Sequence, residues 1–104
     1  MKAKTNLTML CDFYELTMAN GYFQTGLKDR ICYFDVFYRS VPDNGGFALP
    51  AGLAQVVEYI QELNFDEEDL AYLRSKGCFR EEFLDYLRTF RFTGDIWAVP
   101  EGTP

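Results

Sequence analysis

The segment from Ile31 to Arg39 constrains the fold most, because its side chains alternate with the period of a β-strand. One face would carry Phe34, Val36 and Tyr38, and the other would carry Tyr33, Asp35, Phe37 and Arg39. Polar residues occur only on the second face, so we expect that face to meet solvent, a ligand or another subunit. A strand needs a neighbour to pair with, so this pattern predicts a sheet.

Two shorter segments are candidates for the other strands. Residues 42–46 read Pro-Asp-Asn-Gly-Gly, a strong turn signal, and Phe47–Leu49 follows as a short strand. Near the end of the chain, Ile96–Val99 reads as a third strand that Pro100 closes, and Glu101 and Gly102 fit the turn after it.

Four helices are predicted around these strands. The first begins at Asp12, where Glu15 completes a capping-box pattern, and Gly26 supplies a stop. Apolar and aromatic residues recur at roughly helical spacing through this region, at Leu10, Phe13, Tyr14, Met18 and Tyr22. The fold class predicted is α/β, with helices packed on a small sheet.

The other three helices lie between residues 53 and 90. The second has an apolar stripe at Leu53, Val56, Val57, Ile60 and Leu63. The third is capped by Asp66 and ends at Gly77, with acidic residues in its first turn and basic residues in its last. The fourth begins near Arg80 and places Phe83, Leu84, Leu87 and Phe90 on one side.

Composition excludes several classes of function. The net charge is −6 and no cluster of Lys and Arg occurs, which argues against nucleic acid and anionic membranes as partners. No segment approaches the roughly 20 apolar residues of a membrane span. Three widely spaced cysteines without any histidine indicate reduced thiols in the cytoplasm rather than a zinc site.

Aromatic content points to a missing partner surface. Ten Phe and seven Tyr are more than a domain of 104 residues easily buries. The chain also ends at Pro104, directly after an apolar strand, which leads us to expect a truncated chain. It contains no complete catalytic set, because it has no histidine and no Gly-rich phosphate loop.

Four strings in order carry a family resemblance. Residues 12–22 resemble the D-x-Y-E-L-T-M-A-x-G-Y signature that opens nicotinate phosphoribosyltransferases. Residues 34–39 resemble the next strand of that family, residues 45–53 its G-G-[FY]-A-x-x-A-G-L segment, and residues 94–103 the strand leading to its barrel. One departure is Cys11, where the family usually has Thr.

The resemblance implies an enzyme of which residues 1–104 are the N-terminal domain of a type II phosphoribosyltransferase, ending before the catalytic barrel. Such enzymes make nicotinate mononucleotide and pyrophosphate from nicotinate and phosphoribosyl pyrophosphate, with ATP hydrolysis and Mg²⁺. The catalytic histidine lies in the barrel, so this piece alone should be inactive. Head-to-tail homodimers form through the barrel, and the N-terminal segment of one subunit completes the active site of the other.

The resemblance also assigns three substrate-binding residues. Tyr14 would stack on the pyridine ring of the substrate, although it could simply pack in the first helix. Asp12 would orient the same ring, and the competing role is the N-cap of that helix. Arg39 would contact the phosphates of phosphoribosyl pyrophosphate, unless it pairs with Asp35 on the same strand face. We expect no catalytic residue and no metal ligand within this chain.

Two alternatives stay open. The acceptor could be nicotinamide instead of nicotinate, because the strings define the superfamily better than the acceptor. The chain could also be a free-standing dimerisation or interaction module that keeps the fold and its exposed aromatic residues but has no catalytic activity.

Overall fold

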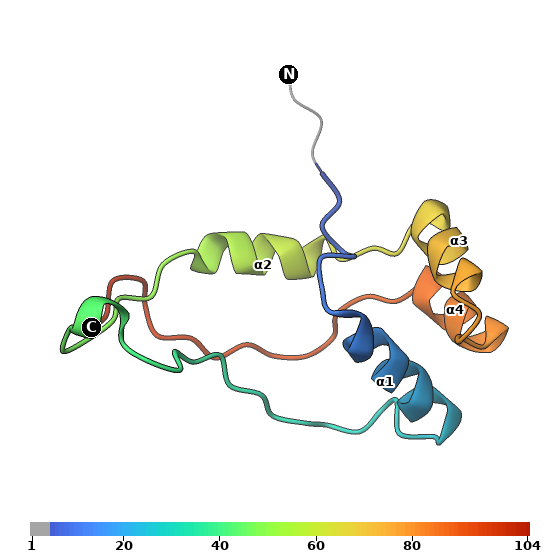
Figure 1. Cartoon of the computed structure of the whole chain (residues 1–104), viewed down its shortest axis with the longest axis horizontal. Coiled ribbons are helices and arrows are strands. Elements are labelled where there is room, and N and C mark those ends of the chain that lie inside the picture. Colours follow the sequence, from blue (N-terminus) through green and yellow to red (C-terminus); the bar gives the residue numbers. More distant parts are fainter. Residues whose placement is uncertain (1–4) are drawn as a thin grey trace.

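Within residues 5–104, the regular structure is entirely helical. The computed structural model describes residues 5–104, and this range contains four α-helices and a short 3₁₀ turn (Figure 1). The helices are α1 (Phe13–Gln24), α2 (Leu53–Gln61), α3 (Glu67–Ser75) and α4 (Glu81–Arg88), and the 3₁₀ turn is η1 (Pro42–Asn44). Apart from η1, the long segments that connect α1 to α2 and that follow α4 have no regular structure.

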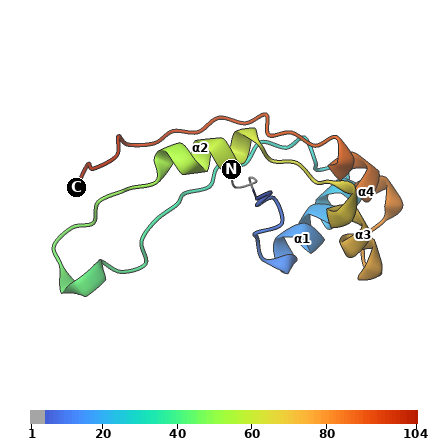
Figure 2. The same ribbon diagram turned by 90° about the horizontal axis from the view of Figure 1, so that it is seen from above.

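Three helices form a helical unit at one end of the molecule. Helix α4 packs against both α3 and α1, and the two views in Figures 1 and 2 agree that α2 lies apart from this unit. The core of the unit consists of buried apolar side chains from all three helices and from the segment before α3: Leu16, Phe65, Leu70, Leu73, Phe83, Leu84 and Leu87. Burying this apolar surface is what stabilises the unit.

Local sequence signals explain where α1 begins and ends. Asp12 is the N-cap in extended conformation, as predicted, but its side chain makes no capping hydrogen bond, so the predicted capping box is wrong in its bonding. Gly26, with a φ of 78°, follows the C-cap as predicted. The N–H of Leu27 donates to the carbonyl of Tyr22 at 2.9 Å, which completes a Schellman-type ending.

Helix α3 has the capping predicted for it. The Asp69 N–H donates to Oδ1 of Asp66 at 2.8 Å, and the Asp66 N–H donates to Oδ2 of Asp69 at 3.2 Å. Both bonds satisfy backbone donors that a helix start leaves free. Gly77 follows the helix with a φ of 73°, a left-handed conformation that favours glycine, and confirms the predicted stop.

The predicted sheet is wrong. Within residues 5–104 the structure contains no β-strand, and the segments 31–39, 47–49 and 96–99 pair with no other backbone as strands. Side chains of these segments lie open to solvent, as the exposed fractions of Tyr33 (94%), Phe34 (90%) and Trp97 (97%) illustrate. The alternating pattern assigns each side chain to one of two faces of an extended segment. A β-strand, however, forms only when a second backbone pairs with the segment, and none does so here.

The turn prediction at residues 42–46 is confirmed. The Gly45 N–H donates to the carbonyl of Pro42 at 3.0 Å, and Asp43 and Asn44 both have positive φ, at 57° and 54°. Positive φ at both central positions is the geometry of a type I′ turn, for which Asp and Asn are among the tolerant residues.

Helix α2 leaves its apolar stripe only partly covered, with Leu53 and Ile60 half-buried. It forms close to where the periodicity predicts it, yet it contributes no buried residue, and Val56 and Val57 are exposed. None of the helices in the described part of the chain has the length and apolar character that crossing a membrane would require.

Candidate functional site

The outer face of α1 carries the first predicted site residue. Tyr14 has 59% of its surface exposed, and Met18 and Tyr22 follow it at successive four-residue steps, also exposed. The opposite face of the helix carries Leu16 and Asn20, which are buried. The stripe that includes Tyr14 therefore faces outward, which leaves the Tyr14 ring open to a flat partner.

The aromatic neighbour of Tyr14 fixes the start of α1. The rings of Phe13 and Phe79 meet edge to face, with centroids 5.7 Å apart, and Phe79 stacks in turn on the buried ring of Phe83 at 6.0 Å. This contact directs Phe13 toward the helical unit. Tyr14, the next residue along the helix, points about 100° away from it.

Asp12 lies one residue before α1 with an exposed side chain. Its carbonyl accepts from the N–H of Glu15 at 3.2 Å, whereas its carboxylate makes no cap hydrogen bond. The N-cap position of Asp12 is thus confirmed, although its side chain makes no hydrogen bond to the helix. The Asp12 carboxylate is therefore exposed at the start of α1, two residues before Tyr14.

Cys11 directly precedes Asp12 at the start of α1. Partial burial raises the pKa of the Cys11 thiol above its ordinary value of 9.0, and the neighbouring carboxylates of Glu15 and Asp12 raise the pKa further. A raised pKa keeps sulfur in the protonated, less nucleophilic form near neutral pH. Cys11 is therefore a poor candidate for a nucleophile.

Arg39 lies on the exposed segment between α1 and α2. Its guanidinium carbon is 5.9 Å from the centroid of the Phe37 ring, a cation–π distance. Among the ion pairs formed by residues 5–104, none joins Arg39 to Asp35, so the competing strand salt bridge is wrong. The guanidinium donors remain open to an anion.

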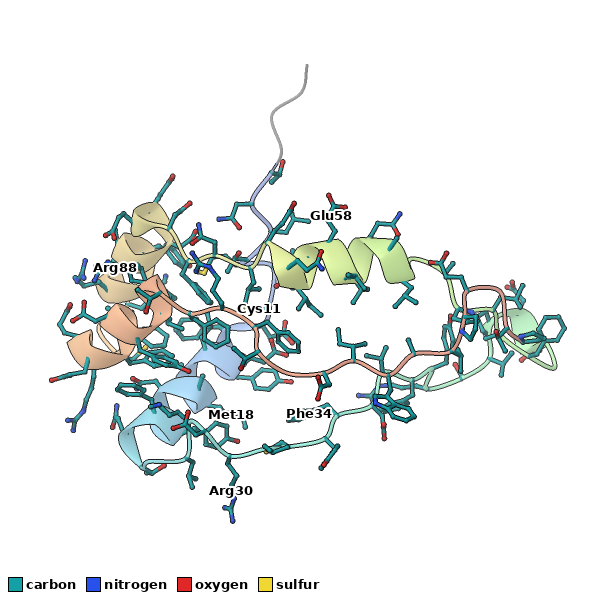
Figure 3. The ribbon with its side chains drawn as sticks, turned by 180° about the vertical axis from the view of Figure 1, so that it is seen from behind. Cys11, Met18, Arg30, Phe34, Glu58 and Arg88 are labelled. Carbon is teal, nitrogen blue, oxygen red and sulfur yellow. The ribbon has the colours of Figure 1, made fainter. Side chains whose placement is uncertain are left out.

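The structure does not join Arg39 to the other two predicted residues. The segment that follows α1 runs away from the helical unit in Figures 1 and 2, and Figure 3 shows Met18 on α1 and Phe34 well along that segment. No contact described for residues 5–104 connects Arg39 with Asp12 or Tyr14. A ligand that touched all three would have to span both parts of the chain.

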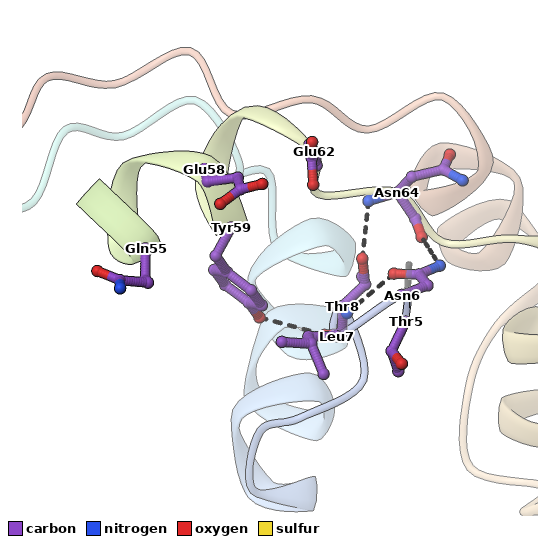
Figure 4. A pocket seen from close by; sticks show the side chains of 9 residues that line it. All are labelled: Thr5, Asn6, Leu7, Thr8, Gln55, Glu58, Tyr59, Glu62 and Asn64. Atoms are coloured by element: carbon purple, nitrogen blue, oxygen red, sulfur yellow. Dashed lines mark hydrogen bonds between the residues drawn. The ribbon is translucent and has the colours of Figure 1, made fainter. Parts of the chain in front are cut away.

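An open pocket of about 490 Å³ lies between the N-terminal segment and α2 (Figure 4). A hydrogen-bond network crosses its floor: the Asn64 N–H donates to Oγ1 of Thr8 at 2.8 Å, and the Tyr59 hydroxyl donates to the carbonyl of Thr8 at 3.4 Å. Asn6 Nδ2 donates to the carbonyl of Asn64 at 3.0 Å. The predicted site residues are not in its lining, and its bonds fasten the N-terminal segment to the end of α2.

Asn20 is a buried polar residue that the sequence analysis did not single out. Its Nδ2 donates to the carbonyl of Cys78 at 3.3 Å, and its Oδ1 accepts from the N–H of Arg80 at 3.3 Å. It therefore ties α1 to the start of α4. The signal was available, because Asn20 lies four residues after Leu16 and three before Phe23, on the inner face of the helix.

The described residues provide no ready site for a metal ion. Within residues 5–104 no group of three or more Cys, Asp or Glu side chains converges as a metal would require.

Comparison with known proteins gives a consistent result. Residues 9–104 match the family model described as the nicotinate phosphoribosyltransferase (NAPRTase) N-terminal domain. Nicotinate phosphoribosyltransferase of Mycobacterium tuberculosis is 45% identical over 95 residues, which cover 91% of this chain and 20% of that protein. The Bacillus subtilis enzyme of the same name is 34% identical over 97 residues, covering 93% of this chain and 20% of its own length.

The similarity extends to animals. Nicotinate phosphoribosyltransferase of Bos taurus is 33% identical over 98 residues, covering 91% of this chain and 18% of that protein. The chain thus spans about a fifth of the length of the curated relatives it matches.

Proposed function

Because the chain belongs to the nicotinate phosphoribosyltransferase family, through that family's N-terminal domain, we propose that it is the N-terminal part of an enzyme of NAD salvage. The complete protein would join nicotinate to the ribosyl group of phosphoribosyl pyrophosphate, releasing nicotinate mononucleotide and pyrophosphate. The match of residues 9–104 to the family model is the observation that carries this proposal.

Tyr14 is proposed to bind nicotinate. Its ring is exposed on α1, and a flat aromatic face suits a planar pyridine ring. Asp12 precedes α1 with a carboxylate that makes no capping hydrogen bond, which leaves it available to orient the same ring. Both residues match positions of the opening signature, and the resemblance implies that this signature lies beside the substrate.

Arg39 is proposed to bind the phosphates of phosphoribosyl pyrophosphate. Its guanidinium forms no ion pair with Asp35 among the described residues, and it lies over the Phe37 ring. A guanidinium can donate two parallel hydrogen bonds to phosphate oxygens. Held against an aromatic ring, it loses less freedom when it binds.

Several properties belong to the complete protein. We propose that it uses ATP with Mg²⁺, works in the cytoplasm and forms a homodimer in which this segment completes the partner subunit's site. The exposed aromatic residues of the segments 31–39 and 96–99 support a role against further polypeptide. The chain has no histidine, so the 104 residues alone are expected to be inactive.

The decisive experiment begins with the reading frame beyond Pro104. A frame that continues into a barrel-sized segment with a histidine allows the complete enzyme to be assayed with nicotinate and with nicotinamide, each with and without ATP. A stop codon there, together with a stable oligomer that binds neither substrate, would establish the interaction module instead.

Variants at two positions then test the site. Tyr14→Ala should raise KM for nicotinate by about 2- to 10-fold, the value of an aromatic stacking contact, whereas Tyr14→Phe keeps the ring and should change it little. Arg39→Ala should raise KM for phosphoribosyl pyrophosphate by about 10- to 100-fold, as expected when a charged hydrogen-bond donor is lost. Unchanged KM values in both alanine variants would refute the assignments.

A further inference from the structure

A tight turn near the end of the chain presents Glu101 to α2. The Thr103 N–H and its hydroxyl both donate to the carbonyl of Pro100, at 3.2 and 2.7 Å. Gly102, the third residue of this turn, has a φ of 80°, as a type II turn requires. Glu101 occupies the second position, from which its side chain extends toward the start of α2.

Backbone N–H groups at the start of α2 bind the Glu101 carboxylate. Its Oε1 accepts from the N–H groups of Gly52 and Leu53, at 2.6 and 2.5 Å. A third bond, from the Gly102 N–H to the carbonyl of Pro50 at 3.0 Å, joins the same two segments. The N-cap of α2 is Gly52, which has no side chain, so the capping oxygen comes from a residue distant in sequence.

The residue before Arg39 is tied to the same place. The Tyr38 hydroxyl donates to the carbonyl of Leu49 at 3.2 Å, and Leu49 directly precedes Pro50. The Arg39 segment gains little from burial, because residues 31–47 are all exposed. Its position therefore depends on hydrogen bonds such as this one. The residues that follow Leu49 are held in turn, because Gly52 and Leu53 bind Glu101 and Pro50 binds Gly102.

We propose that Glu101 and Tyr38 are positioning residues that hold Arg39 where it binds the phosphates of phosphoribosyl pyrophosphate. The inference rests on the proposed function of Arg39. Glu101 fixes residues 50–53, these residues fix the carbonyl of Leu49, and Tyr38 ties the Arg39 segment to that carbonyl. Tyr14, on α1, takes no part in this chain of contacts.

The test measures both Michaelis constants and the melting temperature of the complete enzyme. Tyr38→Phe deletes one hydroxyl, and Glu101→Ala deletes the carboxylate. If either variant leaves the segment correctly placed only about a tenth to a fifth of the time, KM for phosphoribosyl pyrophosphate rises about 5- to 10-fold. KM for nicotinate should stay unchanged.

A matched control is available on α3. Glu68 is likewise an exposed glutamate at the start of a helix, but Asp66 and Asp69 already cap that helix. Glu68→Gln should therefore leave both KM values unchanged. Glu101→Gln, which keeps one acceptor oxygen without the charge, should fall between the wild type and Glu101→Ala.

The outcomes separate the inference from the proposal beneath it. A lower kcat or melting temperature with unchanged KM values, or an equal rise in both KM values, would mean that Glu101 and Tyr38 only stabilise the fold, and would overturn the inference. If Arg39→Ala raises KM for phosphoribosyl pyrophosphate while Tyr38→Phe and Glu101→Ala do not, the inference alone fails. If Arg39→Ala has no effect, the proposed role of Arg39 fails and takes the inference with it.

Discussion

Replacing Asn20 by Ala should destabilise the helical unit of α1, α3 and α4 by about 2 kcal/mol. The side chain is 8% exposed and makes two hydrogen bonds to backbone groups nearly 60 positions away in sequence. Alanine removes both bonds at once. It also leaves the Cys78 carbonyl and the Arg80 N–H without these partners.

The magnitude follows from the two bonds. Each is 3.3 Å long, and a neutral hydrogen bond contributes about 0.5–1.5 kcal/mol net. Two such bonds give about 2 kcal/mol, which is about a 30-fold change in the opening equilibrium. Hydrogen exchange in the native protein should therefore show the amides of α1 and α4 exchanging about 30-fold faster.

Three comparisons make this test specific. Helix α2 contributes nothing to the core, so its amides should exchange at unchanged rates. Thr17→Ala, which removes only a local bond to the Tyr14 carbonyl, should have little effect. Asn20→Asp keeps an acceptor for the Arg80 N–H at the start of α4 and should be intermediate. An acceleration below about threefold in Asn20→Ala would refute the argued role of these bonds.

Four further measurements test other parts of the structure. Asp66→Ala breaks the capping box and should cost about 1 kcal/mol, seen as faster amide exchange in α3; unchanged exchange would contradict the box. Leu84→Ala, at a fully buried core position, should cost about 3 kcal/mol in chemical unfolding, against a negligible effect for an exposed alanine substitution. The raised pKa of Cys11 predicts that its alkylation rate reaches half-maximum above pH 9.0, and a midpoint at or below that pH would contradict it. The Arg88 guanidinium lowers the pKa of Glu67 below 4.5, so this pair stabilises the fold fully above that pH, and the stabilisation is lost as the pH falls. In acid unfolding, the stability of Glu67→Gln should therefore depend less on pH than that of the wild type.

Local sequence signals predicted the helices well. The caps at Asp12 and Asp66 and the stops at Gly26 and Gly77 lie where the sequence placed them. Each depends only on a residue's own backbone preferences and on partners within a few positions. The turn at residues 42–46 was predictable for the same reason.

The candidate site was predictable only as separate residues. The opening signature directs attention to Asp12 and Tyr14, and the structure leaves both side chains exposed at the start of α1. The structure also removes the competing ion pair between Arg39 and Asp35. No contact within residues 5–104 brings Arg39 to the other two residues. The roles of all three toward a ligand stay predictions.

The sequence by itself determined the family, the number of helices and their ends, because these follow from motifs and from short-range backbone chemistry. The tertiary structure alone decided which face of α1 is buried, that Asn20 ties α1 to α4, and that Glu101 caps α2. It also decided that the alternating segment from Ile31 to Arg39 forms no strand. Each of these outcomes depends on a partner distant in the sequence, and a periodic pattern can assign a side chain to a face but cannot supply that partner.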